Sequence, residues 1–176
     1  MRFIRLSIIA ISALTLTGLG AGFVFPSASL AQNSLSNSQL LANGWTIQEA
    51  LVVFKEFELP GEVLDPEKST AKIKGGNRTF FLDGYNCDKN RRCTEFLFSV
   101  GFDLPEGMSL EKVNEWNSRQ LAGRAYLDDE NDPWLDHVVS ILDKNDDSAL
   151  EEGIALWIGA LDKFEAFIFQ KEPDSI

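Results

Sequence analysis

The chain offers few residues for nucleophilic or acid–base chemistry. His137 is the only histidine, and it lies in the apolar stretch Trp134–Ser140. Asp136 is adjacent, but neighbouring residues of a strand point to opposite faces, so the two side chains would not pair. The sequence contains no nucleophile-elbow, phosphate-loop or zinc-protease motif. We therefore predict no catalytic residues, no metal and no cofactor; a hydrolase built on the many carboxylates remains an alternative.

Two acidic segments raise the alternative of an ion or small-ligand sensor. Asp143-Lys-Asn-Asp-Asp147 spaces oxygen side chains as an EF-hand calcium loop does. However, Ser148 stands where that loop needs glycine, and Ile154 stands where it needs a bidentate glutamate. We interpret this segment and the acidic run 128–133 as solvent-exposed turns.

Cys87 and Cys93 are the only cysteines and flank a short turn. In an exported protein, two cysteines so close together are expected to pair. A metal site needs more ligands than these two and a distant histidine supply. A redox pair would favour the C-x-x-C spacing at a helix start. We predict a structural disulfide.

The first 31 residues have the pattern of a secretory signal peptide. Arg2 and Arg5 precede an apolar stretch that runs to Phe25, and Ser29 and Ala31 are small residues at the positions a signal peptidase reads. We predict cleavage between Ala31 and Gln32 and a periplasmic or secreted protein of a Gram-negative-type bacterium. An uncleaved membrane anchor is the alternative.

The composition after this leader argues against several partners. Removing Arg2 and Arg5 with the leader changes the net charge from −11 to −13. Nucleic acids and anionic lipid surfaces select basic patches, so we expect neither as a partner. No second apolar stretch approaches spanning length, so we expect no membrane contact after the leader is removed.

The remaining chain predicts one α+β domain over residues 45–170, between a flexible segment at 32–44 and a tail at 171–176. Hairpins dominate, which favours helices packed on an antiparallel sheet of about five strands, in the order α-β-β-β-α-β-β-α. Capping boxes at Thr46/Glu49 and Ser148/Glu151 mark the first and last helices. The predicted elements are helices 46–57, 109–121 and 148–169 and strands 70–74, 78–85, 94–104, 124–127 and 134–142.

The second predicted helix carries an unusual pair of amides. Asn114 and Asn117 are expected on its inner side, together with Leu110, Val113 and Leu121. Buried amides need partners. They either tie the helix to a strand end or loop, or form a polar spot in a binding cleft beside Arg119 or Arg124.

Four segments together resemble the YbjN-domain family, whose members are described as bacterial sensory transduction regulators. They are Cys87 to Cys93-Thr-Glu-Phe, Gly101-Phe-Asp-Leu-Pro105, Leu110-Glu-Lys-Val-Asn-Glu-Trp-Asn117 and Gly123-Arg-Ala-Tyr-Leu-Asp128. The resemblance runs from about Trp45 to Phe169. It implies a fold like that of type III secretion chaperones and a regulatory role, and it carries over no catalytic residues.

The last helix suggests where a partner would bind. A core stripe of Leu150, Ile154, Trp157, Ile158, Leu161, Phe164 and Ile168 leaves three apolar side chains away from its centre. These are Leu156, Ala160 and Phe167. Either the first helix or the C-terminal tail covers them, or they form a dimer or partner contact. We predict an exported, non-enzymatic binding module for a protein or peptide, with a homodimer as one form.

Overall fold

The structure, a computed structural model, describes residues 44–141 and 143–169. The predicted signal peptide with its Ala31–Gln32 cleavage site, most of the segment 32–44 and the tail lie outside the described residues. The described part confirms an α+β fold with three helices and an antiparallel sheet of six strands, one more than predicted. The elements are α2 (Ile47–Glu56), β1 (Gly61–Asp65), β2 (Thr70–Gly75), β3 (Arg78–Cys87), β4 (Cys93–Gly101), α3 (Leu110–Arg119), β5 (Arg124–Leu127), β6 (Pro133–Ser140) and α4 (Ser148–Ile168).

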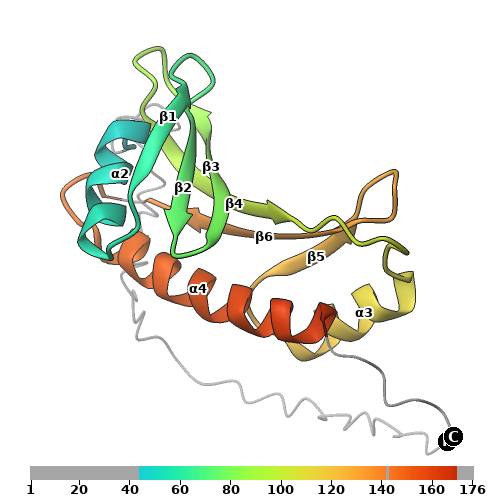
Figure 1. Ribbon diagram of the computed structural model, residues 1–176. Helices are drawn as coiled ribbons and strands as arrows, with labels where there is room; N and C mark the ends of the chain where they lie inside the picture. Colours follow the sequence, from blue (N-terminus) through green and yellow to red (C-terminus); the bar gives the residue numbers. More distant parts are fainter. Residues whose placement is uncertain (1–43, 142, 170–176) are drawn as a thin grey trace, which may run out of the picture. The chain divides into compact units, whose positions relative to one another are not determined.

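The strands lie in the order β1-β2-β3-β4-β6-β5, and every neighbouring pair is antiparallel. Strands β4 and β6 are neighbours in the sheet, although α3 and β5 lie between them in the sequence. Figure 1 shows α2 and α4 on one side of the sheet, with α3 beside β5 near the end of α4. The strands turn markedly across the sheet, as the right-handed twist of β-strands requires.

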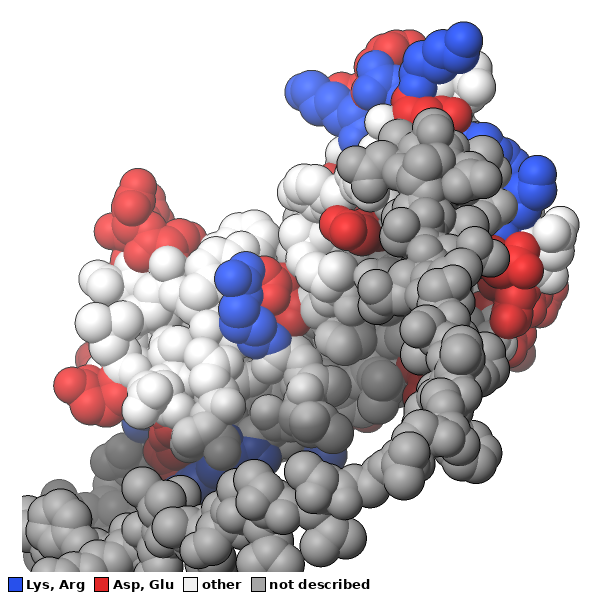
Figure 2. All heavy atoms as spheres, turned by 180° about the vertical axis from the view of Figure 1, so that it is seen from behind, with Lys and Arg blue, Asp and Glu red and all other residues white. Residues whose placement is uncertain are grey.

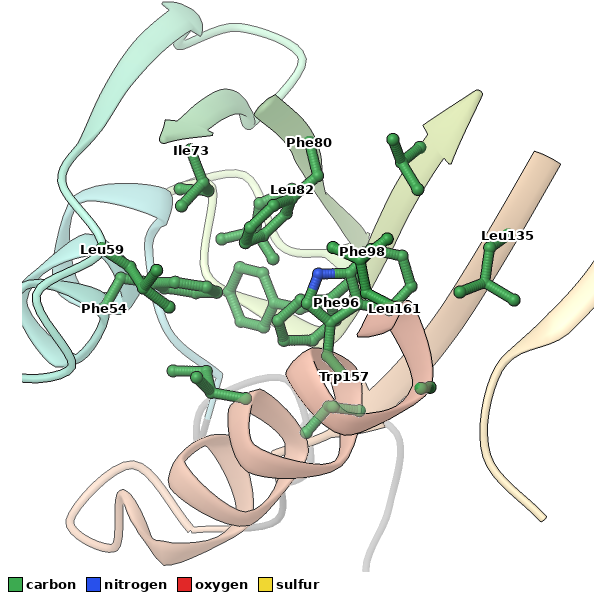
Figure 3. Close-up of a cluster of buried hydrophobic side chains, with 14 of the residues drawn as sticks. Phe54, Leu59, Ile73, Phe80, Leu82, Phe96, Phe98, Leu135, Trp157 and Leu161 are labelled. Carbon is green, nitrogen blue, oxygen red and sulfur yellow. The ribbon is translucent and has the colours of Figure 1, made fainter. Parts of the chain in front are cut away.

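Aromatic rings from helices α2 and α4 and from strands β3 and β4 form the middle of the core (Figure 3). The ring of Phe98 lies 5.5 Å from that of Phe54 and 5.8 Å from that of Trp157. Phe80 lies 5.5 Å from Trp157. All four side chains are fully buried. The period-two pattern of β4 therefore positions its large side chains toward α4, as expected for a half-buried strand.

Strand β1 was not predicted from the sequence. Its five residues are exposed or only half-buried, because it is an edge strand that pairs with β2 alone. Such a strand needs no apolar alternation. Its hairpin is instead closed by Asp65, whose Oδ1 accepts hydrogen bonds from the backbone N–H groups of Glu67 and Lys68. This Asx turn is the local signal for the hairpin.

The buried face of α3 differs from the prediction. Val113 and Trp116 are buried, whereas Leu110 is 71% exposed and Leu121 is fully exposed. The indole of Trp116 decides the orientation, because its ring packs 4.8 Å from that of Phe164. Since α3 ends at Arg119, Leu121 lies beyond the helix. The amides Asn114 and Asn117 are therefore not on the inner side of α3.

The two predicted capping boxes have different outcomes. Thr46 and Glu49 form theirs, with the Glu49 carboxylate accepting from the backbone N–H of Thr46 at 2.8 Å. The box predicted at Ser148 is wrong, because Ser148 is already helical and the N-cap Asp147 makes no side-chain cap bond. Asp146 accepts a hydrogen bond from the Ser148 N–H at 3.0 Å instead. In this acidic turn a carboxylate two residues upstream satisfies the free N–H.

Candidate functional site

Of the four residues predicted for a polar cleft, the structure brings Asn117 and Arg124 together. Asn114 is exposed on α3, and Arg119 pairs with Glu115 at 2.6 Å, so neither lines the cleft. Asn117 and Arg124 border a hollow of about 690 Å³ beside β6. Its lining consists of Asn117, Gln120, Leu121, Gly123, Arg124, Asp136, His137 and Val138.

Asn117 ties α3 to β5 by two hydrogen bonds. Its Nδ2 donates to the backbone oxygen of Ala125 at 3.0 Å, and its Oδ1 accepts from the Ala125 N–H at 2.9 Å. The amide thus replaces a neighbouring strand at this edge of β5. This geometry favours the first of the two interpretations, a helix tied to a strand, while the side chain still borders the hollow.

Replacing Asn117 by alanine is expected to lower the free energy of unfolding by about 1–2 kcal/mol, because both backbone groups of the buried Ala125 lose their partner. Urea denaturation followed by circular dichroism measures the change. Asn114→Ala on the same exposed side of α3 serves as the control and should shift stability by less than about 0.5 kcal/mol. Equal effects of the two substitutions would contradict the role assigned to Asn117.

Arg124 and Asp136, which both line the hollow, form an ion pair. The Arg124 Nε donates to Oδ1 of Asp136 at 3.1 Å, and a second contact joins Nη2 to Oδ2. Asp136 is buried, whereas the Arg124 side chain is 71% exposed. The hydrogen bond with Asp136 raises the pKa of Arg124. Asp136 is therefore committed to Arg124 and does not pair with His137.

Of the three residues predicted as a partner contact, only Leu156 is exposed. Ala160 is 5% exposed, and Phe167 is half-buried with its ring 5.6 Å from that of Trp116. Among the described residues, Trp116 of α3 covers Phe167, and the segment around Gly123 covers Ala160. The tail lies outside the described residues. Phe167 therefore takes part in the packing between α3 and α4, Ala160 is buried beside Gly123, and Leu156 alone of the three presents an exposed side chain.

Leu156 instead borders a second hollow of about 360 Å³, which shares Gln120, Leu121 and His137 with the first. We call the two hollows together the β6 groove. Leu121, Val138 and Leu156 expose apolar surface along it, with Val138 at 54% and Leu156 at 45%. The sequence patterns missed the groove because Leu121 was placed in the core and Val138 in an ordinary strand.

A model of the YbjN family, described as "Putative bacterial sensory transduction regulator", matches residues 51–170. The chain belongs to the YbjN family. The matched range begins within α2 and extends beyond α4, so it contains every residue of the β6 groove. No curated protein and no solved structure matches the chain. The fold likeness of this YbjN domain to type III secretion chaperones stays a prediction.

In both acidic segments of the YbjN domain, carboxylates accept hydrogen bonds from groups within the same turn. Asp128 accepts from the backbone N–H groups of Glu130 and Asp132 and from the indole of Trp134. Asp143 accepts from the N–H of Asn145 at 3.0 Å. Within residues 44–141 and 143–169, no group of three histidine, cysteine or carboxylate side chains could hold a metal ion. The same ranges contain no helix that is long and apolar enough to cross a membrane.

Cys87 and Cys93 form a disulfide across the end of the β3–β4 hairpin. Cys93 is fully buried, and Gly84 lies so close to it that a Cβ on Gly84 would stand 2.6 Å from the Cys93 sulfur. The bridge is therefore part of the packed end of the hairpin. Closing a loop this short contributes about 2 kcal/mol in the chain-entropy model.

Burial changes the pKa of His137, a titratable group that lines the groove. It is half-buried against Phe98, with ring centroids 6.3 Å apart. Burial lowers the pKa of His137 below its ordinary value of 6.5, and the nearby charge of Asp136 opposes this shift only in part.

The free energy of unfolding is therefore expected to fall as pH drops below about 6.5, where the unfolded chain takes up a proton that the folded chain resists. The loss should end once the pH falls below the pKa of folded His137. Urea denaturation between pH 7.5 and 5.5 measures it, with His137→Gln as the control. A wild-type slope that is unchanged in this variant would contradict the assignment.

Proposed function

We propose that this YbjN protein is an exported, non-enzymatic regulatory module that binds a protein or peptide partner through the β6 groove. The observation that carries the proposal is the exposure of three apolar side chains, Leu121, Val138 and Leu156, around one hollowed surface. Clustered apolar exposure at a concave surface is typical of interaction sites.

The chemistry of the reactive groups supports a binding role. His137, the only histidine in the chain, faces Phe98 rather than a nucleophile. The two cysteines are bonded to each other, and the buried carboxylate of Asp136 is paired with Arg124. An acid–base or nucleophilic mechanism requires a base within hydrogen-bond reach of the group that it activates. The family description as a sensory transduction regulator agrees with a binding role.

The disulfide supports the export part of the proposal. Disulfides persist in oxidising compartments such as the periplasm and are rare in the cytosol. Mass analysis of the N-terminus of periplasmic protein tests this part. A mature N-terminus at Gln32 supports export with cleavage, whereas an intact Met1 in the membrane fraction contradicts it.

Crosslinking in cells tests the partner site. The full chain, tagged at its C-terminus, is expressed in a Gram-negative bacterium and crosslinked, and its bound proteins are quantified by mass spectrometry. Leu121→Glu and Leu156→Glu should each reduce one specific crosslinked partner at least tenfold. Val52→Glu adds the same charge at a 61% exposed position on α2, outside the groove, and should leave that partner bound. Circular dichroism checks that all variants fold. An identical set of partners in all three variants would disprove the site.

A further inference from the structure

Strand β6 has a free edge where β5 stops. The register between β5 and β6 ends at the pair Arg124–Asp136, whereas β6 continues to Ser140 and is paired with β4 from Trp134 to Ser140. Residues 137–140 therefore have a neighbouring strand on one side only.

Hydrogen bonds at both ends of β6 show which backbone groups face the free edge. The Ile141 N–H donates to the oxygen of Thr94 at 2.8 Å, and the Pro133 oxygen accepts from Phe102 at 3.0 Å. Odd-numbered residues of β6 thus face β4, and even-numbered residues face the β5 side, because the direction alternates along a strand. The N–H and C=O groups of Val138 and Ser140 point to the free edge, and neither residue has a backbone partner there among the described residues.

Among the residues that the structure describes, this edge lacks the usual protection against strand pairing. Native proteins place charged side chains, prolines, bulges or a covering element at exposed sheet edges. Residues 137–140 are His-Val-Val-Ser, without a formal charge at neutral pH or a proline, and they pair with β4 in unbroken register. His137 and Val138 of this edge line the hollow of about 690 Å³. The edge is therefore accessible to a further strand.

We propose that the β6 groove binds an extended, uncharged or acidic peptide segment of a partner, which adds as a strand to the edge at Val138 and Ser140. This inference rests on the proposed function and names the form of its partner. Extended backbone satisfies the four free groups, as in other cases of strand addition. Successive side chains of the peptide point to opposite faces of the sheet. Those on the α4 side contact Leu156, those on the other side contact Val138, and Leu121 borders both hollows. Gly123 and Arg124 mark the end of the site, because β5 occupies the edge from there.

The charge of the groove suits this occupant, and the net charge of the whole chain disfavours a second copy. The lining contains two cations, Arg124 and Lys163, and one anion, Asp136, which gives a net charge of +1. The whole chain has a net charge of −11, so two copies repel each other. Figure 2 shows, on the side seen from behind, that many charged groups gather at the top and right, whereas the middle and left are largely without charge around one adjacent basic and acidic pair.

Amide hydrogen exchange on the ¹⁵N-labelled full chain tests strand addition. The probe is the blocked peptide acetyl-Glu-Val-Thr-Val-Ser-Val-Thr-Glu-amide, which is acidic and alternates apolar residues. Exchange at the amides of Val138 and Ser140 is expected to slow at least tenfold when the peptide is saturating. Val63 is the control, because its N–H faces the opposite free edge of the sheet, on β1. No slowing at Val138 and Ser140, or equal slowing at Val63, would overturn the proposal.

Two further measurements distinguish strand addition from binding through side chains alone and from self-association. The same peptide with N-methyl groups at alternate residues cannot complete the ladder and should bind at least tenfold more weakly in fluorescence anisotropy; unchanged binding would overturn strand addition. Protection of Val138 without peptide that rises with protein concentration would identify a second copy as the occupant and also overturn it. If the crosslinked partner depends on Leu121 and Leu156 while these edge amides stay unprotected on its binding, strand addition fails and the proposed function stands.

Discussion

Replacing Phe98 by alanine is expected to lower the free energy of unfolding by about 3–5 kcal/mol. Phe98 is fully buried on the central strand β4, and its ring contacts rings from α2, β3 and α4. Alanine would lose this burial and leave a cavity at the point where both helices meet the sheet. Because small domains are stable by only about 5–15 kcal/mol, this one change removes a large part of the total. Urea denaturation followed by circular dichroism measures it.

Two further variants keep this prediction testable if Phe98→Ala does not fold. Phe98→Leu retains most of the buried volume and should cost about 1 kcal/mol. Leu64→Ala removes an apolar side chain that is 50% exposed on the edge strand β1 and should cost less than about 1 kcal/mol. If Phe98→Ala cost no more than Leu64→Ala, the aromatic cluster would not be the centre of the core.

Gly153→Ala and Gly159→Ala are expected to change stability in opposite directions, although both add one methyl group to α4. A Cβ on Gly153 would stand 2.2 Å from Cγ2 of Val139. Val139 is β-branched and has little rotamer freedom with which to move away. We expect Gly153→Ala to lower the free energy of unfolding by about 1–3 kcal/mol. A Cβ on Gly159 meets no atom within 4 Å, so alanine should raise stability by about 0.5–1 kcal/mol.

The contact between Gly153 and Val139 can be tested directly by a double substitution. Adding Val139→Ala to Gly153→Ala removes the clashing methyl groups, so the pair should cost less than the two single changes summed. Thermal unfolding of the wild type, the two single variants and the double variant measures the coupling. Additive effects, or the same sign for both glycines, would show that α4 does not approach β6 as closely as the structure places it.

The sequence alone predicted the features that depend on local interactions. The capping box of Thr46 and Glu49 joins residues three apart, and the alternation in β4 follows from the geometry of a single strand. These signals were sufficient for the α+β class and for the order of the predicted elements. Strand β1 was not predicted because an edge strand with both faces largely exposed has no periodic pattern of apolar residues.

Only the tertiary structure decided which faces are buried and which strand edge stays free. Helical spacing grouped Leu110, Asn117 and Leu121 on one side of the helix. In the structure, the larger ring of Trp116 packs against Phe164, so a different side of α3 is buried. Phe167 was likewise covered by α3, and Ala160 by the segment around Gly123, both distant from α4 in the sequence. The free edge of β6 exists because β5 is shorter than β6. The sequence of β6 cannot indicate how long the neighbouring strand β5 will be. Burial and accessibility are properties of contacts between distant segments, so local patterns could supply the candidate residues but could not assemble them into the groove.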